Sequence, residues 1–145
     1  MCCRKYHTIV LILCLISTVL FSQQKTTEEN GIELIKSVYF GGGSYFIDEE
    51  QMDGIKKFIE EVDNIQNYTI IVAGHTDNIG GKEYNDWLAT MRTMAVKSQL
   101  LKINIPDDLI HLKKFGMENP LYSNYSNLGR KGNRRVDIIL SPIIF

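Results

Sequence analysis

Cysteine is scarce in this sequence, and its placement is narrow. Of the 145 residues only Cys2, Cys3 and Cys14 carry thiols, and all three fall within the first 22 residues. A chain that has lost this segment has no disulfide to stabilise it and no cysteine to ligate a metal or act as a nucleophile. The remaining length, about 120 residues, is enough to bury a hydrophobic core without such cross-links.

Long hydrophobic runs are missing as well. The most apolar stretch, Ile9 to Phe21, has 13 residues, which is shorter than the ~20 that a membrane-spanning helix needs. Arg4 and Lys5 precede this stretch and Ser22 follows it, in the order of charged, apolar and small residues that defines a secretory signal. We therefore predict a signal peptide over 1–22, with an uncleaved N-terminal anchor as the alternative.

The sequence also lacks an excess of basic charge. Without the two basic residues of the predicted signal, 14 Lys and Arg face 17 Asp and Glu, which gives a net charge of −3. A chain of this charge is not expected to bind nucleic acid in general. The four basic residues within 130–135 form a local cluster that suits either a solvated loop or a contact with a ligand or partner.

Catalytic and metal-binding motifs are absent in the same way. No G-x-S-x-G occurs, and no serine is spaced to pair with His75. His75 and Asp77 form a His-x-Asp pair, but a metal site needs more ligands, and the only other histidine beyond residue 22 is His111. These residues therefore support neither a metal site nor a serine hydrolase, and we expect no cofactor.

Hydrophobic periodicity, by contrast, is clear along the chain. It predicts strands over 32–40, 68–73, 110–115 and 135–144, and helices over 48–62 and 82–102. Asp48 and Gln51 have the spacing of a capping box for the first helix. Alternating strands and helices favour a two-layer α/β (α+β) sandwich, with the helices on one face of a mixed sheet. The polar residues 23–36 are predicted as a leader, and the folded domain as 37–145.

The stretch GHTDNIGGKEYNDWLATMR, residues 74–92, carries the most chemistry. Asp77 directly follows a predicted central strand, where ligands of α/β sheets tend to bind. Asn85 and Arg92 are seven residues apart, so they share one face of the following helix, and that face is otherwise apolar. A guanidinium in such surroundings needs a partner. The residues allow two interpretations: a structural Asp77–Arg92 ion pair, or two separate charges that bind a zwitterionic ligand.

An ordered set of motifs resembles the OmpA-like domain, the C-terminal domain of OmpA and MotB proteins that also occurs in peptidoglycan-associated lipoproteins. The set covers roughly residues 37–140 and ends in GRKGNRRV. It consists of GHTDNIG, Tyr84-Asn85, Leu88, Arg92, Val96, Gly116, Pro120, Asn124, Gly129-Arg130 and Asn133 to Val136. Each piece is weak alone, but the complete series in this order is specific.

The resemblance implies a βαβαβ-type fold and a non-catalytic module that binds peptidoglycan through the diaminopimelate of its stem peptide. It assigns Asp77 and Arg92 to the free amine and carboxylate of that ligand, with supporting contacts from Asn85 and Arg134, and with Thr76 in the same loop. It also implies a periplasmic location, reached through the signal peptide, and association with the outer membrane. Envelope proteins are further expected partners, and the mature chain is expected to have no integral membrane span.

One position departs from the family pattern. The family often has an aspartate after the phenylalanine that ends the first strand, whereas this sequence has Gly41 after Phe40. Gly41 is nevertheless predicted to line the ligand site, because the backbone N–H groups of Gly41 to Gly43 can bind an anion. The missing carboxylate motivates an alternative function, a periplasmic protein-interaction or scaffold module that has lost cell-wall binding.

Overall fold

The computed structural model describes residues 32–143, so the predicted signal peptide, and with it the alternative of an uncleaved anchor, lies outside the described residues. The strands are β1 (Leu34–Tyr39), β2 (Tyr68–His75), β3 (Ile110–Gly116) and β4 (Arg135–Pro142), and the helices are α2 (Glu49–Glu60), α3 (Lys82–Lys102) and α4 (Asn127–Asn133). Two single 3-10 turns complete the list. β1 begins inside the range 23–36 that was predicted as a leader.

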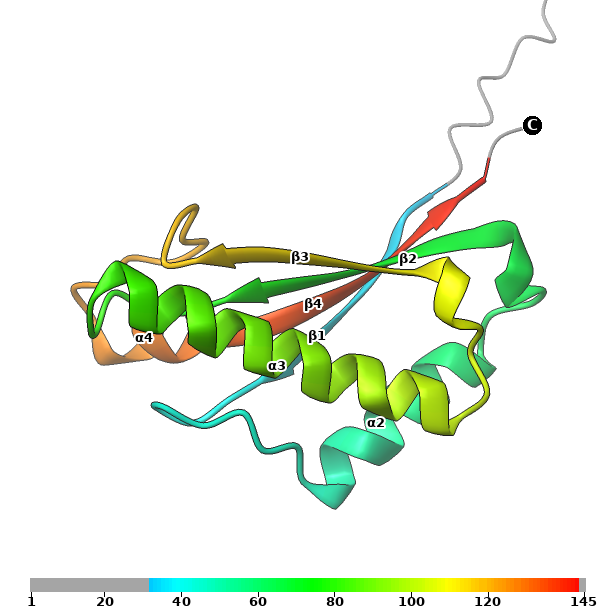
Figure 1. The fold of residues 1–145 in the computed structure, drawn as a ribbon, viewed down its shortest axis with the longest axis horizontal. Helices are drawn as coiled ribbons and strands as arrows, with labels where there is room; N and C mark the ends of the chain where they lie inside the picture. The colour runs from blue at the N-terminus through cyan, green and yellow to red at the C-terminus, as the bar shows by residue number, and fades with distance from the viewer. Residues whose placement is uncertain (1–31, 144–145) are drawn as a thin grey trace, which may run out of the picture. The chain divides into compact units, whose positions relative to one another are not determined.

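The four strands form one mixed sheet in the order β1-β4-β2-β3, which confirms the predicted fold class (Figure 1). β2 and β3 are parallel neighbours in the sheet, and helix α3 connects them, as expected for a strand-helix-strand unit. β4 lies between β1 and β2 and runs antiparallel to both. The first two strands therefore point the same way without being neighbours.

The hydrophobic core lies between the sheet and helices α2 and α3. Val136, Ile138 and Leu140 alternate along β4 and are fully buried, as one face of a strand requires. Val96 and Leu100 of α3 cover them and are equally buried. Each such side chain stabilises the fold by about 1.5–3 kcal/mol relative to exposure.

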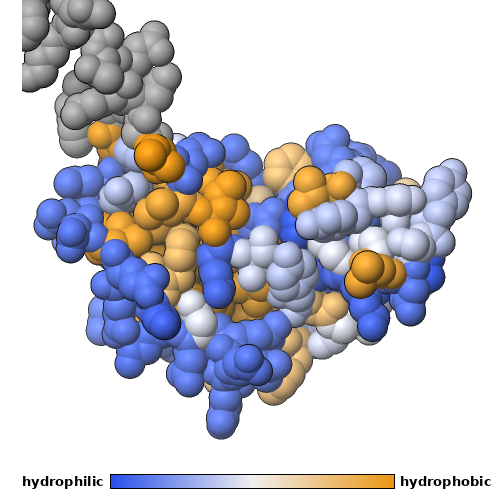
Figure 2. Space-filling view, turned by 180° about the vertical axis from the view of Figure 1, so that it is seen from behind, coloured by the Kyte–Doolittle hydropathy of each residue, from blue (hydrophilic) through white to orange (hydrophobic). Residues whose placement is uncertain are grey.

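Among residues 32–143, no helix of comparable length covers the opposite face of the sheet. Ile35 and Tyr39 of β1 point to that face and are 58% and 49% exposed. Figure 2 views the molecule from behind and shows apolar side chains among hydrophilic ones on this side. The sheet is thus covered mainly from one side, as predicted.

Local chemistry explains where α2 begins. The Asp48 side chain accepts a hydrogen bond from the Gln51 backbone N–H (2.8 Å), and the Gln51 side chain accepts one from the Asp48 N–H (3.1 Å). This is the predicted capping box, and it satisfies two N–H groups that the first turn leaves free. Ile55 and Ile59 then turn into the core.

Helix α4 has no counterpart among the helices that hydrophobic periodicity predicts. Ser126 caps the helix by accepting from the Gly129 N–H (2.9 Å), and seven residues follow in helical conformation. The helix contains Gly129 and Gly132 and has no apolar periodicity. Pattern analysis could not find it, because its stability comes from packing onto the preceding loop rather than from an amphipathic face.

Candidate functional site

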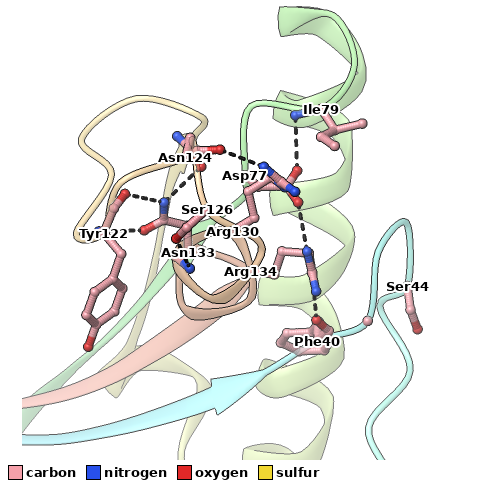
Figure 3. Close-up of polar contacts among 12 residues, drawn as sticks. Phe40, Ser44, Asp77, Ile79, Tyr122, Asn124, Ser126, Arg130, Asn133 and Arg134 are labelled. Atoms are coloured by element: carbon pink, nitrogen blue, oxygen red, sulfur yellow. Dashed lines mark hydrogen bonds and ion pairs between the residues drawn. The ribbon is translucent and has the colours of Figure 1, made fainter.

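The candidate site lies at the edge of the sheet where β1 and β2 end and β4 begins. Tyr39, the last residue of β1, pairs with Arg135, and Gly74 near the end of β2 pairs with Val136. This register brings the loops 40–46 and 76–81 next to Arg134, the residue before β4. Three segments far apart in the sequence therefore meet at one place (Figure 3).

Asp77 is the carboxylate of this edge and is only 7% exposed. Its Oδ1 accepts a hydrogen bond from the Ile79 N–H (3.1 Å), which fixes the turn after β2. Its Oδ2 lies 2.9 Å from Nη1 of Arg134. The Nε of Arg134 also donates to the Phe40 carbonyl (3.1 Å), so this guanidinium joins the ends of β1 and β2 (Figure 3).

Arg92 projects from the middle of α3 and is fully buried. Each of its three nitrogens donates to a backbone carbonyl: Nε to Ser44 (2.8 Å), Nη1 to His75 (3.1 Å) and Nη2 to Gly41 (2.9 Å). Its Cζ lies 5.1 Å from the centre of the Phe40 ring, within cation–π range. The guanidinium thus connects the loop 40–46 to the end of β2.

Burial lowers the pKa of Arg92 to about 10, and the nearby charge of Asp77 opposes that shift. The guanidinium therefore stays protonated at neutral pH. The structural alternative considered above, an Asp77–Arg92 ion pair, is not formed. Within residues 32–143 the ion-pair partner of Asp77 is Arg134, and Arg92 is held by carbonyl oxygens instead.

A glycine in β2 lets α3 come close enough for these contacts. A Cβ added to Gly74 would lie 2.7 Å from the Ala89 carbonyl oxygen and 2.7 Å from Cγ2 of Thr93. No side chain fits at that distance, so only glycine allows the helix to rest on the strand here. Arg92 directly precedes Thr93, so this close packing also fixes the position of Arg92 against the end of β2.

Asn85 fastens the loop that carries Asp77. It is fully buried, and its Nδ2 lies within hydrogen-bond distance of the carbonyls of Ile79 (3.2 Å) and Gly81 (3.2 Å). Thr76 is 2% exposed, and its backbone N–H donates to Gly116 (2.7 Å). In the described part of the chain, Oδ1 of Asn85 and Oγ1 of Thr76 have no hydrogen-bond partner. Buried oxygens of this kind are rare, which marks the loop as unusual.

Charges at this edge do not cancel. Arg92 and Arg134 bring two positive charges, and Asp77 brings one negative charge. A guanidinium also has more N–H groups than the contacts above use. The arrangement can therefore accept an anionic group at the guanidinium side, while Asp77 can accept an ammonium.

A groove of about 770 Å³ adjoins the site. Gly41 and Arg134 belong to its lining, together with Tyr39 of β1 and the segment that includes Tyr122, Leu128 and Gly132. The groove gives the edge a recess on the α4 side.

His75 points to the face of the sheet away from α3. It is 7% exposed, stacks on Phe115 with a centroid distance of 5.0 Å, and its Nε2 lies 3.7 Å from Oδ2 of Asp137. Burial lowers its pKa, the charge of Arg135 lowers it further, and that of Asp137 opposes both. His75 is therefore neutral at pH 7, and its side chain contacts Phe115 and Asp137, whereas its backbone carbonyl contacts Arg92.

Comparison with known proteins decides the family. The profile of the OmpA family matches residues 39–134, which is well over half of the chain. The chain belongs to the OmpA family. Domains of this family are non-catalytic and typically bind peptidoglycan.

Outer membrane protein Omp38 of Acinetobacter baumannii is 32% identical to this OmpA family chain over 114 residues, which is 78% of the chain and 32% of Omp38. The chain thus spans about a third of the length of that relative. The crystal structure of the peptidoglycan-associated lipoprotein from Burkholderia pseudomallei superposes with a TM-score of 0.68 at 25% identity, covering 73% of this chain and 90% of that one. The periplasmic domain of Helicobacter pylori MotB shares the fold, with a TM-score of 0.63, 24% identity and 76% of each chain covered.

The structure brings the predicted site residues of this OmpA family domain to one edge. Thr76 and Asp77 lie in the loop after β2, and Asn85 contacts that loop from α3. Arg134 and Gly41 approach from the other two segments. Their roles toward a ligand stay a prediction. The contacts of Arg92 with Ser44 and His75 were not predictable from the sequence, because both residues accept through backbone carbonyls, which every residue type has. None of the helices between residues 32 and 143 is long and apolar enough to cross a membrane.

Proposed function

We propose that this chain binds peptidoglycan without cleaving it, by holding the free end of the stem-peptide diaminopimelate at the Asp77 edge. The observation that carries the proposal is the uncompensated positive charge of two guanidiniums, the buried one of Arg92 and the partly buried one of Arg134, beside one carboxylate. A free amino-acid end has an ammonium and a carboxylate on one carbon. It matches this pattern of one acceptor and several charged donors.

Each residue has a role in this proposal. Asp77 accepts from the ligand ammonium, while Arg92 and Arg134 donate to its carboxylate. Asn85 and Thr76 shape the loop, and their unpartnered oxygens are available to the ligand. Because the carbonyls of Gly41 and Ser44 rest on Arg92, we propose that the loop 41–44 shifts when the carboxylate arrives.

The proposal also places the protein in the periplasm. Its relatives include outer-membrane proteins and lipoproteins, and the structure of a peptidoglycan-associated lipoprotein is similar. Binding at this site would hold the chain against the cell wall. Envelope proteins would then be its neighbours and partners.

A test is co-sedimentation of the full chain with purified peptidoglycan sacculi. Asp77→Asn keeps the side-chain shape and removes the charge, and a hydrogen bond to a charged group contributes about 1.5–3 kcal/mol, so retention should fall by about tenfold or more. Asp107→Asn is the matched control, because Asp107 is exposed and pairs with Lys97 away from the site. Thermal melting checks that both variants fold.

Retention of Asp77→Asn at the wild-type level would contradict the proposal. The second candidate function, a protein-interaction or scaffold module, is favoured by Gly41, which supplies no carboxylate and whose carbonyl is already used by Arg92. It predicts weak retention of the wild type itself and a protein partner that cross-links at this edge.

A further inference from the structure

Three aromatic side chains form an exposed patch beside the proposed site. The ring centres of Tyr45 and Trp87 are 6.1 Å apart in an edge-to-face arrangement, and those of Trp87 and Tyr84 are 5.9 Å apart. Each residue keeps 44–48% of its surface exposed. We call Tyr45, Tyr84 and Trp87 the aromatic patch.

The aromatic patch has no part in the core. Tyr84 and Trp87 are three residues apart on α3 and so occupy one face of the helix, while Leu88 points into the protein and is 3% exposed. Tyr84, a member of the family motif series, lies outside the hydrophobic core. Packed aromatic rings that remain this exposed are typical of a binding surface.

Tyr84 connects the aromatic patch to both loops of the proposed site. Its Oη lies 3.1 Å from the position of a Cβ on Gly43, and its Cδ1 lies 2.9 Å from that of a Cβ on Gly80. Both glycines have positive φ, +66° and +97°, so both turns bring bare backbone against this ring. Tyr45 directly follows Ser44, whose carbonyl accepts from Arg92. The patch and the site therefore share their loops.

The chemistry of the aromatic patch favours a neutral ring with one apolar face. Its side chains carry no charge at neutral pH, and their polar atoms, two hydroxyls and an indole N–H, lie at the ring edges. A pyranose sugar presents C–H groups on one face, which pack on an aromatic ring, and hydroxyl and acetamido groups at its rim. Those rim groups can hydrogen-bond to the edge atoms.

The covalent structure of peptidoglycan indicates which sugar could occupy the aromatic patch. In peptidoglycan the diaminopimelate is the third residue of a stem peptide whose first residue is joined to an N-acetylated amino sugar. Three extended residues span about 10 Å. A stem peptide held at Asp77 therefore keeps its sugar close to the loops that Tyr84 contacts.

We propose that the aromatic patch binds the N-acetylated sugar of the same peptidoglycan fragment whose diaminopimelate occupies the Asp77 edge. This inference rests on the proposed function and extends it from the peptide to the glycan. Stacking on aromatic rings should make a fragment with its sugars bind about fivefold tighter than the same peptide without them.

Trp87 makes the test direct, because it is the single tryptophan of the sequence. The full chain is titrated with a disaccharide-tripeptide that ends in diaminopimelate, and with the sugar-free tripeptide, while tryptophan emission and its quenching by acrylamide are followed. The disaccharide-tripeptide should shift the emission and protect Trp87 from the quencher. The sugar-free tripeptide should bind, as measured by calorimetry, without either effect.

Variants separate the aromatic patch from the peptide site. Tyr45→Ala should reduce the affinity for the disaccharide-tripeptide to that for the tripeptide, and leave the tripeptide affinity unchanged. Trp87→Ala, followed by calorimetry, should do the same. Tyr125→Ala is the matched control, since this tyrosine is 99% exposed outside the patch, and it should change neither affinity.

Equal wild-type affinities for the two ligands would overturn the inference and leave the proposed function standing. A parallel loss of both affinities in Tyr45→Ala and Trp87→Ala would also overturn it, since that is the result of a purely structural role. If the wild type binds neither ligand, the proposed function fails and the inference fails with it.

Discussion

Replacing Arg92 by methionine removes a buried guanidinium and little else. Methionine has a similar length and a similar helix propensity, so α3 itself should be unaffected. Three carbonyl oxygens, of Ser44, His75 and Gly41, lose their charged donor at once. The contact between Cζ and the Phe40 ring, at 5.1 Å, is lost as well.

The size of the effect follows from opposing contributions. Hydrogen bonds from a charged donor contribute about 1.5–3 kcal/mol each, and the cation–π contact adds about 0.5–2 kcal/mol. Burial of the charge costs part of this, as the lowered pKa of Arg92 indicates. The carbonyls of Gly41 and Ser44 lie in a loop that can turn to water. We therefore expect Arg92→Met to reduce the free energy of unfolding by about 3 kcal/mol, near the low end for a broken buried charged contact.

Urea unfolding followed by circular dichroism measures this change. With a denaturant slope of about 1–3 kcal/mol per molar, the midpoint should fall by about 1–3 M. Arg130→Met is the matched control, because Arg130 of α4 is partly exposed and donates to the Asn124 carbonyl (2.9 Å) in the loop before α4. It should cost less than about 1 kcal/mol, because the partly exposed Asn124 carbonyl can hydrogen-bond to water once Arg130 is replaced. An Arg92→Met midpoint within about 0.3 M of wild type would refute the reasoning that this side chain organises the edge.

Three further outcomes are expected. Gly74→Ala should lose about 1–3 kcal/mol in urea unfolding, because its Cβ would meet the α3 backbone at 2.7 Å, whereas Gly42→Ala, with nothing within 4 Å, should be neutral. Burial lowers the pKa of His75, so the folded state binds fewer protons than the unfolded one, and stability should be complete above about pH 6.5 and fall at lower pH. His75→Phe should show a smaller loss between pH 7.5 and 5.5 than wild type, and substitution of the exposed His111 should not. Free diaminopimelate at about a hundred times its Kd should stabilise the wild type by about 2.7 kcal/mol in thermal melts. An unchanged melting temperature of the wild type would count against the pocket. So would an equal rise in the melting temperature of Asp77→Asn.

Some elements could be predicted from the sequence because the interactions that define them are local. The Asp48–Gln51 capping box set the start of α2, and the predicted helix 82–102 matches α3 because Pro106 and the residues before it cannot continue a helix. The β-branched run after Tyr68 predicted a central strand, and β2 indeed has neighbours on both sides. The ordered motif series indicated the family, which the profile match to residues 39–134 confirms.

Only the tertiary structure decided how these pieces meet. β4 pairs with both β1 and β2, and which strand edges are open to it depends on how the whole chain folds. Spacing along the sequence carries no such information. That placement of β4 brings Arg134 within 2.9 Å of Asp77. Arg92 instead donates hydrogen bonds to three backbone carbonyls. Charge complementarity predicted that a guanidinium would need a partner, but a backbone carbonyl is present at every residue. The sequence by itself determined the four strands, the two long helices, the family and the residues of the edge. Helix α4 and the pairing of the edge residues depended on tertiary packing.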